Sequence, residues 1–201
     1  SLQHEAPDSM HFLPAALKPL EKYPQFILCH LSPDPAHPGK TKKIPVHPQT
    51  LVADNPHLPR MWMSFEAAMQ TAIKLGLGYV SGTGFAVGFV LTKQDPFYCV
   101  DIDNCIDAAG PNATAQYLMS SLPGAAVEVS QSGKGMHIFG KTGPVEHSCK
   151  NVRLGLELYT DNRFIVITAN DCKGNADTDS TIPLRKIVDE FFSINAAIDD
   201  G

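Results

Sequence analysis

Two aspartates separated by a single residue are the first side chains in this sequence that could do chemistry. Asp101 and Asp103 lie in the segment FYCVDID, residues 97–103, whose apolar residues predict a β-strand. Successive strand side chains point to opposite faces, so both aspartates share one face, where their charges repel. A divalent cation relieves this repulsion, and Mg²⁺ or Mn²⁺ commonly binds one or two carboxylates together with substrate phosphates. The alternative is a strand end at which both side chains only face water.

A second strand-like segment, GLELY at residues 155–159, carries Glu157 on the face opposite its two leucines. The turn-like residues TDN follow, and this pattern predicts a hairpin whose second strand, residues 163–168, opens with Arg163. A lone glutamate on a strand usually faces water. If Glu157 lies beside the two aspartates, however, three carboxylates and one guanidinium would suit a metal-bound triphosphate.

A Gly-Lys loop, SQSGKGMHIFG at residues 130–140, suggests a phosphate site. It is not a P-loop, because that motif needs an upstream glycine, a Ser or Thr after the lysine, and a following helix. Here Glu128 occupies the glycine position, Gly135 follows the lysine, and residues 136–139 read as a strand. The loop therefore predicts a tight turn between two strands, in which glycines let backbone N–H groups approach an anion.

Side chains in and after this turn offer further contacts to a phosphate. Ser132, Gly133 and Lys134 are the candidates on the turn, and His137 lies on the following strand, on the face opposite its apolar neighbours. A histidine in such a position can be purely structural. We favour a contact with the phosphate or the metal, because the Gly-Lys turn is adjacent.

The composition is that of an ordinary globular protein: 201 residues, 43% hydrophobic and 18% charged. No apolar run approaches the roughly 20 residues of a membrane span, and no secretory signal is recognisable. Five cysteines without a CxxC pair fit a reducing compartment, and we predict no zinc. We therefore expect a cytoplasmic protein without a membrane partner.

The charge of the chain limits how it could meet a nucleic acid. The net charge of −5 is not typical of nucleic-acid-binding proteins, so any such contact would be local. The one concentrated basic group is Lys40, Lys42 and Lys43, for which a solvated loop is the alternative.

Strands and helices alternate along the chain and must position these residues. A helix is predicted to begin after Ser64 and to end at Gly76, and two more are expected over residues 114–122 and 184–192. Residues 1–12 read as a disordered leader, and the proline-rich residues 32–60 as a long irregular connection. With its many hairpins, the pattern predicts an α+β (mixed α/β) fold with a largely antiparallel sheet.

Taken in order, three motifs resemble the catalytic domain of phage and plasmid primase-polymerases, of the archaeo-eukaryotic primase superfamily. They are VDIDN (residues 100–104), SGKGMH (132–137) and LELYTDNRFIVIT (156–168). Further upstream, KKIP, SFEAAM and GLGYV also resemble the phage branch, and the resemblance covers roughly residues 18–170.

The resemblance implies a primase-type fold, in which an RRM-like catalytic half packs against a smaller α/β half. The domain would span residues 13–201, with an N-terminal lobe at about 13–95 and the catalytic part at about 96–195. The implied chemistry is template-directed nucleotidyl transfer from NTPs or dNTPs on single-stranded or primed DNA, with two Mg²⁺ or Mn²⁺ ions.

The resemblance also implies roles for the candidate residues. Asp101, Asp103 and Glu157 would bind the metals. The incoming triphosphate would be held by Ser132, Gly133, Lys134 and His137, and His137 would also belong to the catalytic set. Arg163 would act at the nucleotide or the template, and Lys43 would contact a phosphate or the template.

Two features of some relatives have no counterpart here: a Cys/His zinc element and a helicase segment with a Walker motif. The partner would then be a helicase domain or a helicase protein absent from this chain, and whether the chain is an excised domain of a larger protein stays open. Two other functions remain open from the residues alone. One is a metal-dependent nuclease or phosphoryl hydrolase that uses the same carboxylates, and the other is a non-catalytic nucleic-acid-binding replication module.

Overall fold

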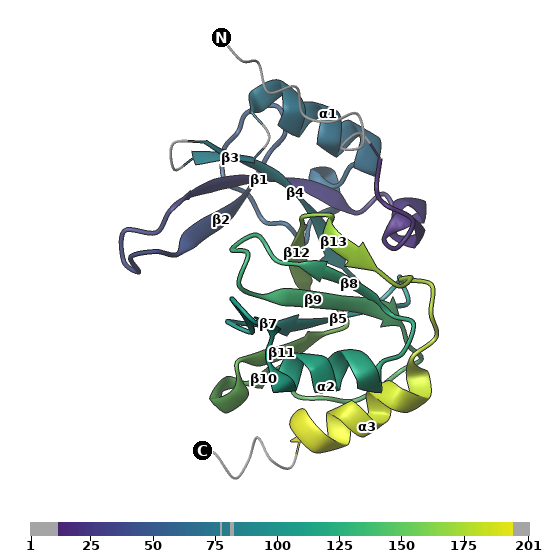
Figure 1. Cartoon of the computed structure of the whole chain (residues 1–201). Coiled ribbons are helices and arrows are strands. Elements are labelled where there is room, and N and C mark those ends of the chain that lie inside the picture. Colours follow the sequence, from purple (N-terminus) through teal and green to yellow (C-terminus); the bar gives the residue numbers. More distant parts are fainter. Residues whose placement is uncertain (1–11, 77, 81–82, 195–201) are drawn as a thin grey trace.

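The computed structural model describes residues 12–76, 78–80 and 83–194, so the predicted leader, except its last residue, lies outside the described residues. Two large antiparallel sheets, called sheet A and sheet B, and three α-helices make up the described part of the chain (Figure 1). The predicted mixed α/β class with largely antiparallel sheets is confirmed.

Sheet A has the strand order β12-β4-β1-β2, with β3 added on β4. Its strands are β1 (Phe26–Pro33), β2 (Thr41–Val46), β3 (Gly78–Val80), β4 (Thr83–Leu91) and β12 (Arg163–Ile167). Strands β1 and β2 form a long ribbon that projects from the upper part of the molecule in Figure 1.

Sheet B has the order β10-β11-β5-β9-β8-β13. Its strands are β5 (Phe97–Ile102), β8 (Ala126–Val129), β9 (Met136–Lys141), β10 (Lys150–Asn151), β11 (Leu156–Tyr159) and β13 (Asn170–Lys173). A small separate hairpin joins β6 (Ile106–Asp107) and β7 (Gly110–Pro111).

The helices are α1 (Phe65–Leu75), α2 (Ala113–Ser121) and α3 (Thr181–Phe191), with short 3-10 helices η2 (Lys18–Lys22), η3 (Pro59–Met61) and η4 (Val152–Leu154). The predicted ends of α1 are confirmed. The Ser64 hydroxyl accepts the N–H of Ala67 at 3.1 Å, and Gly76 closes the helix with a left-handed φ of 106°.

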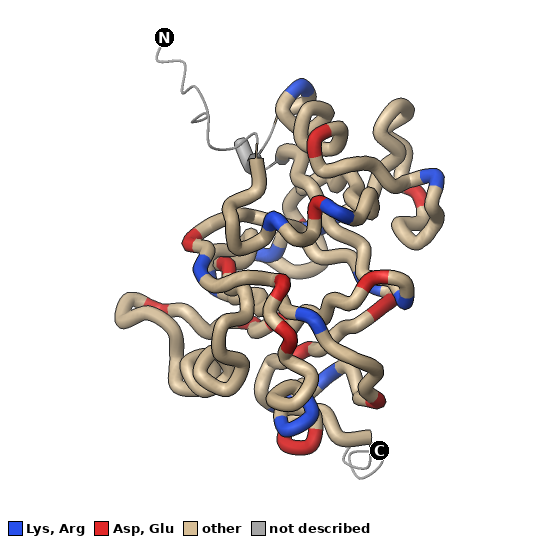
Figure 2. The backbone as a smooth tube through the Cα atoms, turned by 90° about the vertical axis from the view of Figure 1, so that its right-hand side faces the viewer, with Lys and Arg blue, Asp and Glu red and all other residues tan. Residues whose placement is uncertain are grey.

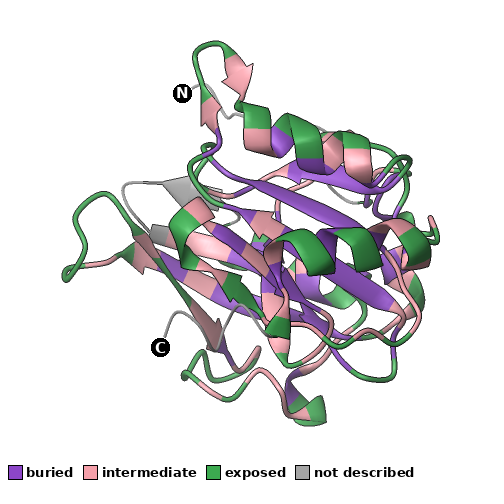
Figure 3. Cartoon of the chain, turned by 90° about the horizontal axis from the view of Figure 1, so that it is seen from below, coloured by how far each residue is buried: buried purple, intermediate pink, exposed green. Residues whose placement is uncertain are grey.

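The two sheets and the helices form layers with separate hydrophobic cores. Helices α2 and α3 cover one face of sheet B, where Val100 and Ile138 pack with Leu118 and Ile187 (Figure 1). The other face of sheet B packs against sheet A and the α1 layer through a second core of buried residues. Seen from below in Figure 3, the central strands are mostly buried and the outer sides of the helices are exposed.

Strand β5 explains where the core stops and a polar site begins. Phe97 and Cys99 lie on its face toward sheet A and are buried in the shared core. Asp101 follows on the same face and is only partly buried, because the apolar contacts with sheet A end before it. The same strand thus holds the sheets together at one end and presents a carboxylate at the other.

The predicted hairpin of residues 155–168 is wrong. Strand β11 pairs with β5 in sheet B, whereas β12 pairs with β4 in sheet A. Asn162, in the connection, has a left-handed φ of 51°, a conformation that asparagine tolerates in tight turns. The turn therefore carries the chain from one sheet to the other, which the alternation of apolar residues cannot reveal.

The prediction of an irregular connection over residues 32–60 is also wrong in part, because β2 lies within it. Its lysines and Pro45 obscure the strand pattern. Both are typical of an edge strand, and β2 lies at the edge of sheet A, next to β1. Among the described residues, none of the helices has the length and apolar character needed to cross a membrane.

Candidate active site

A row of polar side chains crosses four neighbouring strands of sheet B. Glu157 on β11 pairs with Asp101 on β5, Asp101 pairs with His137 on β9, and His137 pairs with Glu128 on β8. Directly opposed residues of antiparallel strands point to the same face. The register therefore brings residues far apart in sequence together on the face toward sheet A.

The histidine lies between Glu128 and Asp101 in this row and is close to both. Its Nδ1 lies 2.8 Å from Oε2 of Glu128, within hydrogen-bond range, and its Nε2 lies 3.7 Å from Oδ1 of Asp101. His137 and Glu128 are both buried. The ring is thus anchored on one side, and its second nitrogen is directed toward Asp101.

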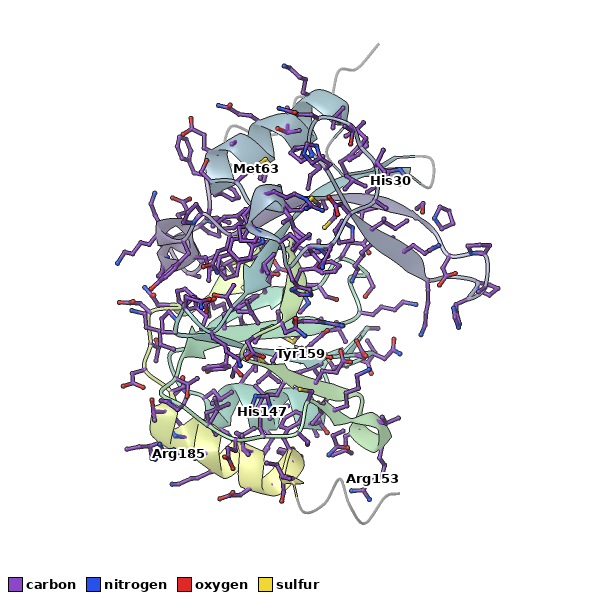
Figure 4. The ribbon with its side chains drawn as sticks, turned by 180° about the vertical axis from the view of Figure 1, so that it is seen from behind. His30, Met63, His147, Arg153, Tyr159 and Arg185 are labelled. Atoms are coloured by element: carbon purple, nitrogen blue, oxygen red, sulfur yellow. The ribbon has the colours of Figure 1, made fainter. Side chains whose placement is uncertain are left out.

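Cations and a tyrosine surround Glu157 at the other end of the row. The hydroxyl of Tyr159 donates to Oε1 of Glu157 at 3.1 Å, while Lys150 Nζ and an Arg163 Nη2 atom each lie 3.9 Å from its carboxylate. The Arg163 guanidinium also stacks over the Tyr159 ring at 4.6 Å. Tyr159 lies near the centre of the molecule in Figure 4, so Arg163 has a fixed support beside the carboxylates.

A pocket of about 240 Å³ opens beside the row. Its charged and polar lining consists of Thr41, Lys43, Asp101, His137 and Arg163, and Phe164, Ile165 and Val166 complete it. Strands β2 and β12, at opposite edges of sheet A, both contribute to this lining. The pocket therefore combines two cations from sheet A with a carboxylate and a histidine from sheet B.

The carboxylates in this region carry perturbed pKa values. Burial raises the pKa of Asp101, nearby His137 lowers it, and the negative charge of Glu157 raises it further. Burial and the charge of Asp101 raise the pKa of Asp103. Mutually repelling carboxylates with raised pKa values, one of which lines a pocket, are typical of functional sites.

The carboxylates are a partial fit to a metal site. In the described ranges, no group of three or more His, Cys, Asp or Glu side chains is arranged to hold a metal ion. Asp101 and Asp103 do supply hard oxygen donors whose repulsion a cation would relieve. Mg²⁺ commonly takes one or two carboxylates and completes its coordination with water and substrate phosphates.

The Gly-Lys turn connects β8 and β9, as predicted, and is held by its own hydrogen bonds. The Ser130 hydroxyl accepts the N–H of Gly135, and the Ser132 hydroxyl accepts the N–H of Lys134, both at 3.1 Å. Gly133 has a left-handed φ of 76°. Ser132, Gly133 and Lys134 are exposed and do not contribute to the pocket lining.

The structure thus brings together Asp101, His137, Glu157, Arg163 and Lys43, with Asp103 just beyond the end of β5 and the turn residues at the surface. Their roles as metal ligands or nucleotide contacts remain predictions.

Sequence reasoning missed the part that Glu128 plays in this row. It had considered the residue only as a mismatch to the P-loop pattern. The available signal was the alternation in AVEV, residues 126–129, which puts a glutamate between apolar neighbours on a predicted strand. Glu128 is fully buried and accepts backbone N–H groups of Thr168 and Ala169 at 3.1 and 3.0 Å.

Comparison with known proteins gives one informative similarity. No family model matches the chain. A curated protein named DNA Primase-polymerase, from Nitratiruptor phage NrS-1, is 27% identical over 168 residues, which is 81% of this chain. The match covers 21% of that relative, so the chain spans about a fifth of its length. This similarity supports a relationship between the chain and a phage primase-polymerase.

Proposed function

We propose that this chain is the catalytic domain of a DNA primase-polymerase, which adds nucleotides to a strand under the direction of a DNA template. The observation that carries the proposal is the row Glu157–Asp101–His137 beside a pocket that also holds Lys43 and Arg163. The similarity to the phage protein supports the same activity.

The size and charge of the pocket favour the triphosphate of an NTP or dNTP as its occupant. Its volume of about 240 Å³ is below the roughly 300–1,000 Å³ of pockets that enclose whole drug-sized ligands. Lys43 and Arg163 would meet the phosphates from sheet A. An arginine can offer two parallel N–H donors to a phosphate, and stacking on Tyr159 would hold it in place.

Asp101, Asp103 and Glu157 would hold two Mg²⁺ or Mn²⁺ ions when nucleotide is bound. Such ions would supply positive charge that offsets the charge of the phosphates and makes the attacking hydroxyl more acidic. The raised pKa values of Asp101 and Asp103 support a site whose carboxylates are stabilised by bound cations.

The protein groups would act on the nucleotide by position and charge. The primer 3′-hydroxyl would attack the α-phosphate in line and lose its proton to water, a new P–O bond would form, and pyrophosphate would leave with the electron pair of the bond that breaks. His137 would contact a phosphate oxygen through Nε2, and Lys134 with the backbone of Gly133 and Ser132 would cover the triphosphate from the turn. Groups fixed in this way stabilise the charge that develops on the phosphates.

The wider architecture belongs to the same proposal. Sheet B with α2 and α3 would be the RRM-like catalytic half of a primase-type fold, and sheet A with α1 the smaller half, which β12 joins from the C-terminal part of the chain. Single-stranded or primed DNA would be the template, and a helicase domain or protein the partner. Figure 2 shows basic and acidic positions interspersed along the backbone on one side of the molecule, so template contacts would be local.

A primer-extension assay tests this function directly. A labelled primed template is incubated with dNTPs and Mn²⁺ or Mg²⁺, and a parallel reaction with single-stranded DNA and NTPs tests priming. We expect the primer to lengthen, and Asp101→Ala to abolish the product. Shortening of the labelled strand would instead identify a nuclease. Failure of the folded protein to extend or prime would favour a non-catalytic module.

A further inference from the structure

We propose that Glu128 is a positioning residue that fixes the ring of His137, so that Nδ1 carries a proton and Nε2 faces the pocket. The consequence for nucleotide transfer rests on the proposed function, whereas the ring geometry does not.

The burial of Glu128 is the first observation. Its side chain is completely inaccessible, and an ionised carboxylate is costly to bury unless it is paired and hydrogen-bonded. Here both oxygens have partners: Oε1 accepts the N–H groups of Thr168 and Ala169, and Oε2 lies 2.8 Å from Nδ1 of His137. Both carboxylate oxygens therefore have hydrogen-bond partners, and His137 is one of the three main partners.

The hydrogen bonds also determine the orientation of the ring. An ionised carboxylate can only accept, so Nδ1 of His137 must be the donor. Nε2 is then left free toward the pocket, at 3.7 Å from Asp101, a separation too long for a direct hydrogen bond. Nε2 donates to a phosphate oxygen in the pocket when the ring carries a proton on both nitrogens, and the Glu128 carboxylate accommodates such a ring whereas an amide NH₂ facing Nδ1 does not.

The backbone around Glu128 supports the same role. Ala169 donates to Glu128 from a left-handed conformation with φ 58°, which is strained for a residue with a Cβ. Thr168 and Ala169 connect β12 of sheet A to β13 of sheet B. Glu128 on sheet B thus binds the segment that leads in from sheet A. The strained residue Ala169 lies at the carboxylate that holds His137, and strain of this kind is common at functional sites.

Glu128→Gln separates positioning from simple structural support. The two backbone N–H donors require an oxygen at the Oε1 position, so the glutamine NH₂ group must face His137. This group donates, and Nδ1 would have to become the acceptor, which moves the ring proton to Nε2. The shape of the side chain is preserved while its hydrogen-bond direction toward the histidine is reversed.

The matched control is Asp95→Asn. Asp95 is also a buried carboxylate with backbone donors, from Thr92 at 2.7 Å and Phe97 at 2.9 Å, and no histidine in the described part of the chain bonds to it. It does not line the pocket. Both substitutions replace a buried carboxylate with an amide, but only Glu128→Gln changes a residue that is hydrogen-bonded to His137.

The decisive measurement is ¹⁵N NMR of the histidine rings at a single pH, with His137 signals assigned by their loss in His137→Ala. We expect a protonated Nδ1 in the wild-type protein and in Asp95→Asn, and a shift of the proton to Nε2 in Glu128→Gln. An unprotonated Nδ1 in the wild-type protein, or an unchanged ring in Glu128→Gln, would overturn the proposal.

Steady-state primer extension supplies the second readout. We expect kcat to fall about 10- to 100-fold in Glu128→Gln, the usual cost of removing a residue that orients a functional histidine, with a smaller change in KM for nucleotide. Asp95→Asn should retain kcat. Equal losses in both variants would indicate a structural role only. If the wild-type protein fails to extend primers, the proposed function fails, while the ring spectra still decide the role of Glu128.

Discussion

Asp101 stands directly opposite Glu157 in the antiparallel pair of β5 and β11. Like charges at directly opposed positions destabilise a sheet, and the charge of Glu157 is one of the causes that raise the pKa of Asp101. The cations close to this pair, Arg163 and Lys150, approach Glu157 only to 3.9 Å. The pair therefore fits a function that requires two carboxylates at one place better than it fits a structural role.

Asp101→Asn should abolish primer extension without lowering the melting temperature. The substitution keeps the size of the side chain but removes a charge that would contact the metal and the phosphates, and losses of about 100-fold or more are expected when such a group is removed. Asp107→Asn is the control, since Asp107 is an exposed aspartate on β6. Robust extension by Asp101→Asn would disprove the metal assignment.

In metal-free buffer, the unfolding free energy of the wild-type protein should fall more with rising pH than that of Asp101→Asn. Burial raises the pKa of Asp101 above its ordinary value of 3.8, so the folded chain binds this proton more tightly than the unfolded chain. The stability from this group is present below the ordinary pKa and is lost as the pH rises through the raised one.

Urea unfolding at several pH values from about 4 to about 7 measures this difference, because the proteins share all other titrating groups. The raised pKa of Asp103 also makes stability fall with rising pH, and it does so in both proteins. In Asp101→Asn this effect is smaller, because the charge of Asp101 is one cause of the raised pKa. Parallel curves for the two proteins would contradict a raised pKa at Asp101.

Mg²⁺ or Mn²⁺ should stabilise the wild-type protein more than Asp101→Asn, most clearly with a nucleotide present. A ligand that binds only the folded state adds about 2.7 kcal/mol when its concentration is 100 times Kd. Thermal unfolding with the metal, and again after addition of EDTA, measures the effect. Equal shifts in the two proteins would mean that the cation binds away from Asp101.

The sequence was sufficient for the local features of this site and insufficient for its partners. Alternation along β5 put Asp101 on the face opposite Val100 and Ile102, and Ser64 with Gly76 predicted the ends of α1, because these features depend on neighbours in the chain. Which strands lie beside β5 depends on long-range pairing. The sequence could therefore predict a three-carboxylate site only on the condition that Glu157 lies beside Asp101.

Two residues whose surroundings were predicted wrongly or missed also depend on long-range strand pairing. Arg163 was predicted to lie on a strand paired with that of Glu157, yet its strand belongs to sheet A and approaches Glu157 across the pocket. Glu128 was considered only as a mismatch to the P-loop pattern and not as a partner of His137, because both its partner strand and its backbone donors are set by the tertiary fold.

Lys43→Ala should raise the KM for nucleotide about 10-fold or more, because a charge-assisted hydrogen bond contributes roughly 1.5–3 kcal/mol. Lys43 lines the pocket. Its neighbour Lys42 is the matched control, since adjacent strand residues point to opposite faces and Lys42 is exposed and outside the pocket lining. Steady-state kinetics compare the two variants, and equal increases in KM would mean that charge on β2 acts only from a distance.

Gly135→Ala should weaken nucleotide binding while leaving DNA binding nearly unchanged. A Cβ at Gly135 would lie 2.8 Å from the carbonyl oxygen of Ile102 and 2.8 Å from Oγ of Ser130. The backbone of β5 cannot yield easily, so the whole turn that carries Lys134 must move, at a cost of about 1–3 kcal/mol. Gly143→Ala is the control, because its nearest neighbour would be 3.6 Å away. Fluorescence titrations with a labelled dNTP and a labelled DNA separate the two affinities. Normal nucleotide binding by a folded Gly135→Ala protein would remove the turn from the triphosphate site.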